Sequence, residues 1–216
     1  MKKWLNLCIP TIGLIMSSPM FADVDSSNPY ILVNSVAQNT FSRLKDNKDR
    51  YQANSDLLYV VVEEELMPYI NVRYAAMKVL ASQAREATKE ERDLFTEAFY
   101  GYMVESYVHI LRGYTDQELK VEPIKAVDLK QRIVSVRVEI MDSVRPPIRF
   151  DFILRRNGKT HHWQVFDLQI EGVSILDVKA GEWSAKLRKN GIKAVAKELE
   201  LRLKSPNNKG NKVEGE

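Results

Sequence analysis

Residues 163–176 combine an alternating strand pattern with a glycine turn and a short apolar segment. Because successive side chains of a strand point to opposite sides, three apolar side chains share one face: Phe166, Leu168 and Ile170. Gly172 stands at the end of this strand, where glycine allows a sharp reversal at little steric cost. We therefore expect the chain to turn there and to carry the next apolar residues back over that face: Val173, Ile175 and Leu176.

Helical spacing dominates the chain before this strand. Asn28-Pro29 supplies a capping residue and a proline at the first helical position. Thr88 and Glu91 form a capping box ahead of the longest apolar stripe. Apolar residues that recur every three or four positions predict a helix after Asn28-Pro29 and three more over the ranges 57–67, 71–84 and 88–114.

The period changes to two from residue 118 onward, which indicates strands. Four strands are predicted over the ranges 118–127, 132–141, 148–156 and 162–170. Asn157-Gly158 is a strong hairpin signal, and the short connections favour antiparallel neighbours. Two C-terminal helices follow, divided at Asn190-Gly191.

These patterns predict an α+β fold in one domain, residues 23–205. An antiparallel, four-stranded or slightly larger meander sheet has one apolar and one charged face, so the N- and C-terminal helices cover one face only. Phenylalanine and tyrosine recur along the 88–114 helix, opposite that sheet. We expect an apolar cavity between the two layers, with an ordinary filled core as the alternative. Residues 206–216 are predicted to be a disordered tail.

The N-terminal residues read as a secretory signal. Lys2 and Lys3 precede a mostly apolar run that is too short to span a bilayer comfortably, and cleavage is expected near Ala22. Cys8 is the only cysteine and leaves with the signal, so no disulfide or cysteine metal site is expected. Removing two lysines lowers the net charge from +3 to +1. Acids and bases are interspersed, and we predict no nucleic-acid partner.

Signs of catalysis are weak in this sequence. His161 and His162 are adjacent, so a strand would point them to opposite sides and away from a shared metal. Serines occur without a nucleophile elbow, and no glycine-rich phosphate loop is present. Asp167 is expected to form an ion pair with Arg155 or Arg156. We therefore predict no catalytic residues, no metal and no cofactor, and a protein that is not an enzyme.

Several short motifs, in order, resemble the MlaC family of the Mla (toluene-tolerance) pathway: Thr40-Phe41-Ser42-Arg43-Leu44-Lys45, Glu65-Leu66-Met67-Pro68-Tyr69, Ala87-Thr88 with Arg92 and Phe95, Arg145-Pro146-Pro147, Trp163-Gln164 with Asp167, Glu171-Gly172-Val173-Ser174, and Trp183. The sequence has Ala81 where the family pattern has glycine, and Phe166 where tyrosine is common. The resemblance covers nearly all of the chain after residue 28.

The resemblance implies a monomeric periplasmic phospholipid carrier of a Gram-negative cell, which maintains outer-membrane lipid asymmetry. Its partners would be an outer-membrane lipoprotein complex of the MlaA type and an inner-membrane ABC transporter complex with an MlaD-type subunit. The bound phospholipid would be cargo. Two arginines at matching positions are interpreted as partner-docking residues, with ordinary solvated surface as the alternative: Arg92 and Arg145.

The family turn places Val173 in the wall of a pocket for lipid tails, so Val173→Glu should abolish lipid binding without unfolding the protein. The direction in which apolar side chains face adds further candidate lipid-binding residues: Tyr69, Val72, Phe99, Tyr107, Val138, Ile140, Phe150, Phe152, Phe166, Leu168, Ile175 and Leu176. Two other functions stay open: an exported adaptor without ligand, which requires a filled core, and an exported enzyme, which requires titratable groups converging in an apolar pocket.

Overall fold

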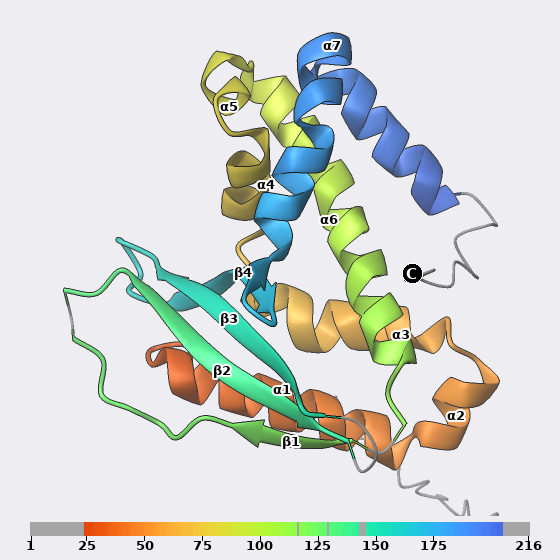
Figure 1. Ribbon diagram of the computed structural model, residues 1–216, viewed down its shortest axis with the longest axis vertical. Helices are drawn as coiled ribbons and strands as arrows, with labels where there is room; N and C mark the ends of the chain where they lie inside the picture. Colours follow the sequence, from red (N-terminus) through yellow and green to blue (C-terminus); the bar gives the residue numbers. More distant parts are fainter. Residues whose placement is uncertain (1–23, 116, 129, 143–145, 205–216) are drawn as a thin grey trace, which may run out of the picture.

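The computed structural model describes residues 24–204 apart from 116, 129 and 143–145 (Figure 1). The predicted signal peptide, the tail and Arg145 lie outside the described residues. The first half of the described chain is helical, with these elements: α1 (Pro29–Asp46), α2 (Lys48–Ala53), α3 (Leu57–Val61), the π-helix η1 (Val62–Leu66), the 3-10 helix η2 (Met67–Tyr69), α4 (Val72–Leu80), α5 (Gln83–Glu86) and α6 (Lys89–Arg112).

The predicted caps are present. Asn28 Oδ1 accepts hydrogen bonds from the backbone N–H groups of Tyr30 and Ile31, at 2.8 and 3.3 Å, and so opens α1. The capping box of Thr88 and Glu91 opens α6 through reciprocal hydrogen bonds of 3.1 and 3.0 Å. Ala81 ends α4 with a φ of 52°. Only glycine takes such a conformation without strain, which explains why glycine suits this position.

A five-stranded antiparallel sheet follows, in the order β1-β2-β3-β4-β5. The strands and the last helix are β1 (Glu118–Val121), β2 (Ile133–Met141), β3 (Ile148–Arg156), β4 (Trp163–Ile170), β5 (Val173–Ser174) and α7 (Ile175–Lys204). The α+β class and the meander are therefore confirmed. The first strand ends at Val121 rather than at residue 127, because Pro123 has no N–H to donate to a ladder.

The predicted turn after the fourth strand is confirmed, but the returning chain extends the edge of the sheet as β5 instead of crossing the face of β4. Glu171 and Gly172 both have a positive φ, of 50° and 84°. The turn returns the chain as β5, which pairs Val173 with Ile170. Helix α7 then bends at Gly191, with a φ of 79°, where the sequence predicted a break between two helices.

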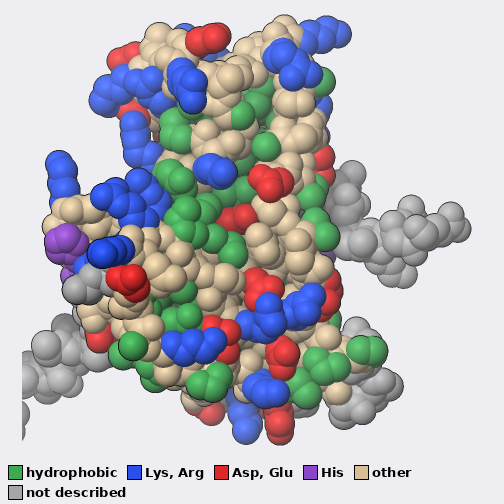
Figure 2. Space-filling model, turned by 60° about the vertical axis from the view of Figure 1, so that its left-hand side comes forward, with side chains coloured by type: hydrophobic (Ala, Val, Ile, Leu, Met, Phe, Trp, Pro, Cys, Tyr) green, Lys and Arg blue, Asp and Glu red, His purple; other side chains and the backbone are tan. Residues whose placement is uncertain are grey.

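In Figure 1, α1 lies along the sheet, whereas α4, α6 and α7 pack against one another in a group that extends above the sheet. Helix α6 packs against α7 through an aromatic cluster in which Trp183 contacts three rings: Phe95, Phe99 and Tyr102. Acidic and basic side chains are interspersed over the face shown in Figure 2, with hydrophobic side chains between them.

A bulge in β4 changes the predicted direction of one side chain. Leu154 of β3 pairs with Val165, but the preceding Ile153 pairs with Asp167, so Phe166 is the extra residue of the bulge. Val165 and Leu168 consequently face the same layer. Phe166 packs edge-on against Tyr74 of α4, with ring centroids 4.9 Å apart. The expectation that Phe166 and Leu168 share one face is wrong, because strict alternation does not hold across a bulge.

Candidate apolar binding site

A cavity of about 350 Å³ lies between the sheet, α1, the η1–η2 segment and the C-terminal half of α6. Helix α1 supplies one wall: Leu32, Val33, Val36, Ala37, Thr40 and Phe41. The segments 66–70 and 107–117 supply another: Leu66, Tyr69, Ile70, Tyr107, Ile110, Leu111, Gly113, Tyr114 and Gln117. The sheet closes it: Leu119, Val138, Ile140, Ile148, Phe150, Phe152, Val165 and Leu168. A volume of this size is in the range of about 300–1,000 Å³ typical of ligand pockets.

The lining has almost no polar groups that would need a hydrogen bond from a ligand. None of the described residues that line the cavity carries a charged side chain. The Thr40 hydroxyl donates to the carbonyl of Val36 at 2.7 Å, so its hydrogen bond is made within α1. Burial, and then the charge of Asp167 nearby, raise the pKa of the Tyr107 hydroxyl well above its ordinary value, so the hydroxyl is neutral. Such a wall suits hydrocarbon.

The cavity opens on one side. Ile110 at the end of α6 and Ile148 at the start of β3 both line it and are 37% and 40% exposed. Ile148 pairs with Ile140, which also lines the cavity. These three isoleucines therefore mark the mouth, where an apolar ligand would enter.

Seven of the predicted lipid-binding residues line the cavity together: Tyr69, Tyr107, Val138, Ile140, Phe150, Phe152 and Leu168. The structure places the other six elsewhere: Val72, Phe99, Phe166, Val173, Ile175 and Leu176. Phe99 is buried against Trp183, with ring centroids 6.2 Å apart, because the N-terminal half of α6 faces α7 rather than the sheet. Val173 is 55% exposed on β5. Whether these six contact a ligand stays a prediction.

The wall from α1 was missed as part of the site, although its apolar stripe was visible in the sequence. Nothing in a single sequence shows which apolar stripe lies next to a cavity. Ile110 and Leu111 were likewise visible on the α6 stripe. Val165 was assigned to the opposite face because the bulge at Phe166 was not foreseen.

Asp167 anchors the start of α7 behind this wall. Its carboxylate accepts hydrogen bonds from the Ser174 hydroxyl at 2.7 Å and from the backbone N–H of Leu176 at 3.2 Å. The Ser174 hydroxyl in turn accepts from the N–H of Asp177. The register places Asp167 opposite Ile153, whereas Arg155 lies 4.3 Å from the centre of the Tyr74 ring. Asp167 thus fixes a helix start, and the expected pairing across the hairpin with Arg155 is not formed.

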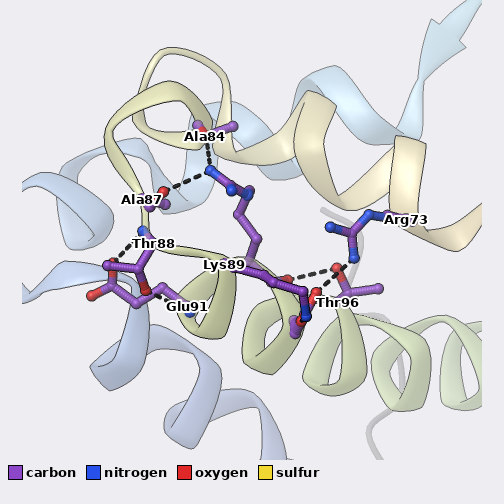
Figure 3. Close-up of polar contacts among 9 residues, drawn as sticks. Arg73, Ala84, Ala87, Thr88, Lys89, Glu91 and Thr96 are labelled. Atoms are coloured by element: carbon purple, nitrogen blue, oxygen red, sulfur yellow. Dashed lines mark hydrogen bonds and ion pairs between the residues drawn. The ribbon is translucent and has the colours of Figure 1, made fainter.

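Arg92 has a structural role in addition to any role in docking. Its guanidinium donates to the carbonyls of Ala87 at 2.6 Å and Ala84 at 3.3 Å, the contacts drawn in Figure 3. Ala84 lies within α5 and Ala87 directly follows it, so Arg92 ties the end of α5 to the first turns of α6. Whether Arg92 also docks a partner stays a prediction.

Across residues 24–204, apart from the gaps, no group of three His, Cys, Asp or Glu side chains is placed to hold a metal ion. Over the same part of the chain, no helix is long and apolar enough to cross a membrane.

Fold and cavity together define an α+β protein with an apolar ligand-sized cavity. Residues 34–201 match the family described as MlaC protein, and the chain belongs to that family. It is 27% identical over 207 residues, 95% of each chain, to the intermembrane phospholipid transport system binding protein MlaC of Haemophilus influenzae. It is 24% identical over 179 residues, 82% of this chain and 81% of the relative, to toluene tolerance protein ttg2D of Pseudomonas putida.

A solved structure shares the fold. The phospholipid-binding protein from Ralstonia solanacearum, determined in complex with a phospholipid, superposes with a TM-score of 0.71. The match covers 82% of this chain and 97% of that one, at 16% identity.

Proposed function

We propose that this chain is a periplasmic phospholipid carrier that holds the lipid tails in the cavity and leaves the head group at the mouth. The observation that carries the proposal is the uncharged cavity of about 350 Å³, open at the three isoleucines. Each methylene moved from water into such a wall gains about 0.8 kcal/mol. The names of the relatives support the same cargo.

The transport route and the processing of the chain belong to the same proposal. The carrier would move lipid between an MlaA-type outer-membrane complex and an MlaD-type inner-membrane complex, and so maintain outer-membrane asymmetry. It would act as a monomeric single domain after cleavage of the signal near Ala22, without a cofactor and without catalysis. Arg92 and Arg145 are the proposed docking residues. No Asp, Glu, His, Cys, Lys or Arg side chain lies in the described lining, which disfavours an enzyme, and the cavity disfavours an adaptor with a filled core.

Native mass spectrometry of the protein purified from its own cell envelope, followed by organic extraction, tests the proposal. A mass excess that resolves into phospholipid is expected. A folded protein with the bare mass of the chain after gentle purification would contradict it and favour the adaptor.

A charged variant then tests whether this cavity holds the lipid. Ile140→Glu places a carboxylate in the half-buried wall just inside the mouth, where an unpaired charge beside hydrocarbon is unfavourable. Ser135→Glu is the matched control, because Ser135 is exposed on the same strand and lies outside the lining. We expect the first variant to lose lipid and the second to keep it, with both folded by circular dichroism. Full lipid occupancy in a folded Ile140→Glu variant would contradict the proposed site.

Val173→Glu tests separately whether the turn before α7 contacts the cargo. Because Val173 is 55% exposed, a carboxylate there is tolerated by the fold. Loss of lipid from this variant would show that the turn over residues 171–174 contacts the cargo at the rim, whereas retained lipid would restrict the cargo to the lining residues.

A further inference from the structure

Two of the short sequence motifs meet in the structure through one arginine. Arg43 belongs to the motif over residues 40–45 of α1, and Glu65 opens the motif over residues 65–69. Arg43 Nη1 lies 2.7 Å from Glu65 Oε1, and Arg43 Nη2 lies 2.7 Å from Glu64 Oε2. Each carboxylate thus takes its own nitrogen, and charged contacts at this distance are among the strong polar interactions of proteins. We call these three side chains the Arg43 clamp.

The Arg43 clamp joins two walls of the cavity. On α1, Thr40 and Phe41 line the cavity three and two positions before Arg43. On the other side, Leu66 directly follows Glu65 and lines the cavity from the η1–η2 segment. The clamp residues themselves lie outside the lining, so they restrain the two walls without contacting a ligand.

The wall that carries Leu66 has an irregular backbone. The segment η1 is a π-helix, and η2 is a 3-10 helix that contains Pro68, which has no N–H for a helical hydrogen bond. π-helices are rare, and 3-10 hydrogen bonds have poorer geometry than those of an α-helix. Helix α1 is by contrast a regular helix of 18 residues, capped at Asn28. A side-chain contact with α1 therefore restrains a part of the wall that its own hydrogen bonds hold less firmly.

Burial distinguishes the two carboxylates of the clamp. The Glu65 side chain is 13% exposed and the Arg43 side chain 24%, whereas that of Glu64 is 45% exposed. Exposed ion pairs contribute little, because water and salt screen them. Removal of one partner from a more buried pair costs more. The contact between Arg43 and Glu65 is therefore the main part of the clamp.

We propose that Arg43 is a positioning residue for the cargo: through Glu65 it holds the η1–η2 wall against α1 and so keeps the lipid tails in the cavity. The inference rests on the proposed function, since it concerns the release of the same cargo. Without the clamp, the wall that carries Leu66 and Tyr69 is free to move outward, and the tails leave faster.

Lipid exchange measures this retention. The signal-cleaved protein is loaded from vesicles of ordinary phosphatidylethanolamine and mixed with an excess of vesicles of deuterated phosphatidylethanolamine. Native mass spectrometry then follows the replacement of light by heavy lipid. We expect Arg43→Gln and Glu65→Gln each to raise the exchange rate about fivefold, which corresponds to an ion pair at the upper end of the range for exposed pairs. Glu64→Gln should raise it less, because Glu64 is the more exposed partner.

Two comparisons separate positioning from a general loss of stability. In the double variant Arg43→Gln/Glu65→Gln the same contact is lost only once, so its rate should match that of Arg43→Gln alone. Arg73→Gln is the matched control, because Arg73 links α4 to α6 through Asp93 at 2.6 Å and neither residue lines the cavity. Its exchange rate should stay at the wild-type value. A merely structural role of Arg43 predicts a lower melting temperature with an unchanged exchange rate.

The outcomes separate the two proposals. If the wild-type protein takes up no lipid from the loading vesicles, the proposed function fails. If it binds lipid and the Arg43→Gln and Glu65→Gln variants exchange it at the wild-type rate, the carrier stands and the role of Arg43 is refuted. An equal acceleration in Arg73→Gln would also refute it, because any broken ion pair would then loosen the protein. If Arg43→Gln does not fold, Glu65→Gln tests the same contact from its other side.

Discussion

Replacement of Asp167 by alanine should destabilise the protein far more than the loss of one exposed carboxylate. The carboxylate accepts three hydrogen bonds: from the Ser174 hydroxyl at 2.7 Å, and from the backbone N–H groups of Leu168 and Leu176 at 2.8 and 3.2 Å. A hydrogen bond to a charged group contributes about 1.5–3 kcal/mol, and bonds that share one acceptor group do not add fully. We expect the free energy of unfolding to fall by about 3 kcal/mol.

Thermal unfolding followed by circular dichroism measures this loss. For a chain of this length, 1 kcal/mol lowers the melting temperature by about 2–4 °C, so the expected decrease is about 6–12 °C. Asp177→Ala is the control, because Asp177 is exposed in the first turn of α7 and its backbone N–H, not its carboxylate, contacts Ser174. That variant loses only a helix-dipole interaction of about 0.3–1 kcal/mol. Equal melting temperatures for the two variants would refute the anchoring role of Asp167.

Three further predictions concern stability and charge. Hydrogen bonds from Lys89 and Arg73 hold the pKa of Asp93 at about 2, below its ordinary 3.8. The stability that these contacts contribute should therefore persist above pH 4 and be lost as the pH falls toward 2. An NMR titration of the Asp93 carboxyl carbon with a midpoint near 3.8 would contradict this. Arg92→Ala removes the donor to two backbone carbonyls and should lower the free energy of unfolding, measured by urea denaturation, by about 1–3 kcal/mol. A purely docking role for Arg92 predicts an unchanged urea midpoint. Ala81→Gly removes the strain of an alanine held at a φ of 52° and should raise the free energy of unfolding by about 1 kcal/mol in the same assay. A free energy of unfolding no higher than that of the wild type would show that the strain is small.

Local patterns in the sequence were sufficient for the order and type of the main elements. The caps at Asn28 and Thr88, the turn at Gly172 and the break at Gly191 all depend on residues close together in the chain. The period of two also identified the strands β1 to β4, although β1 is shorter than predicted. These features are local, so one sequence contains them.

The shape of the site depended on features that no local pattern encodes. The bulge at Phe166 is a mismatch between two strands, and neither strand shows it alone. The stripe of α6 faces α7 in its first half and the cavity in its second, and this division follows from where the part of α7 that carries Trp183 packs on α6. For this reason Tyr107 lines the cavity, whereas Phe99 on the same stripe lies in the core.

The size of the cavity also bears on the thermodynamics of the unloaded protein. A void in a protein core costs about 24 cal/mol per Å³. For about 350 Å³ this is on the order of 8 kcal/mol, as large as the total stability of many domains. Contraction of the walls and entry of water reduce that cost, but the ligand still completes the core. By mass action the loaded form is the more stable one, so the melting temperature reports occupancy. If the cavity holds lipid tails as proposed, discharge into water would expose both the tails and the void, and direct transfer from one apolar surface to another would avoid that cost.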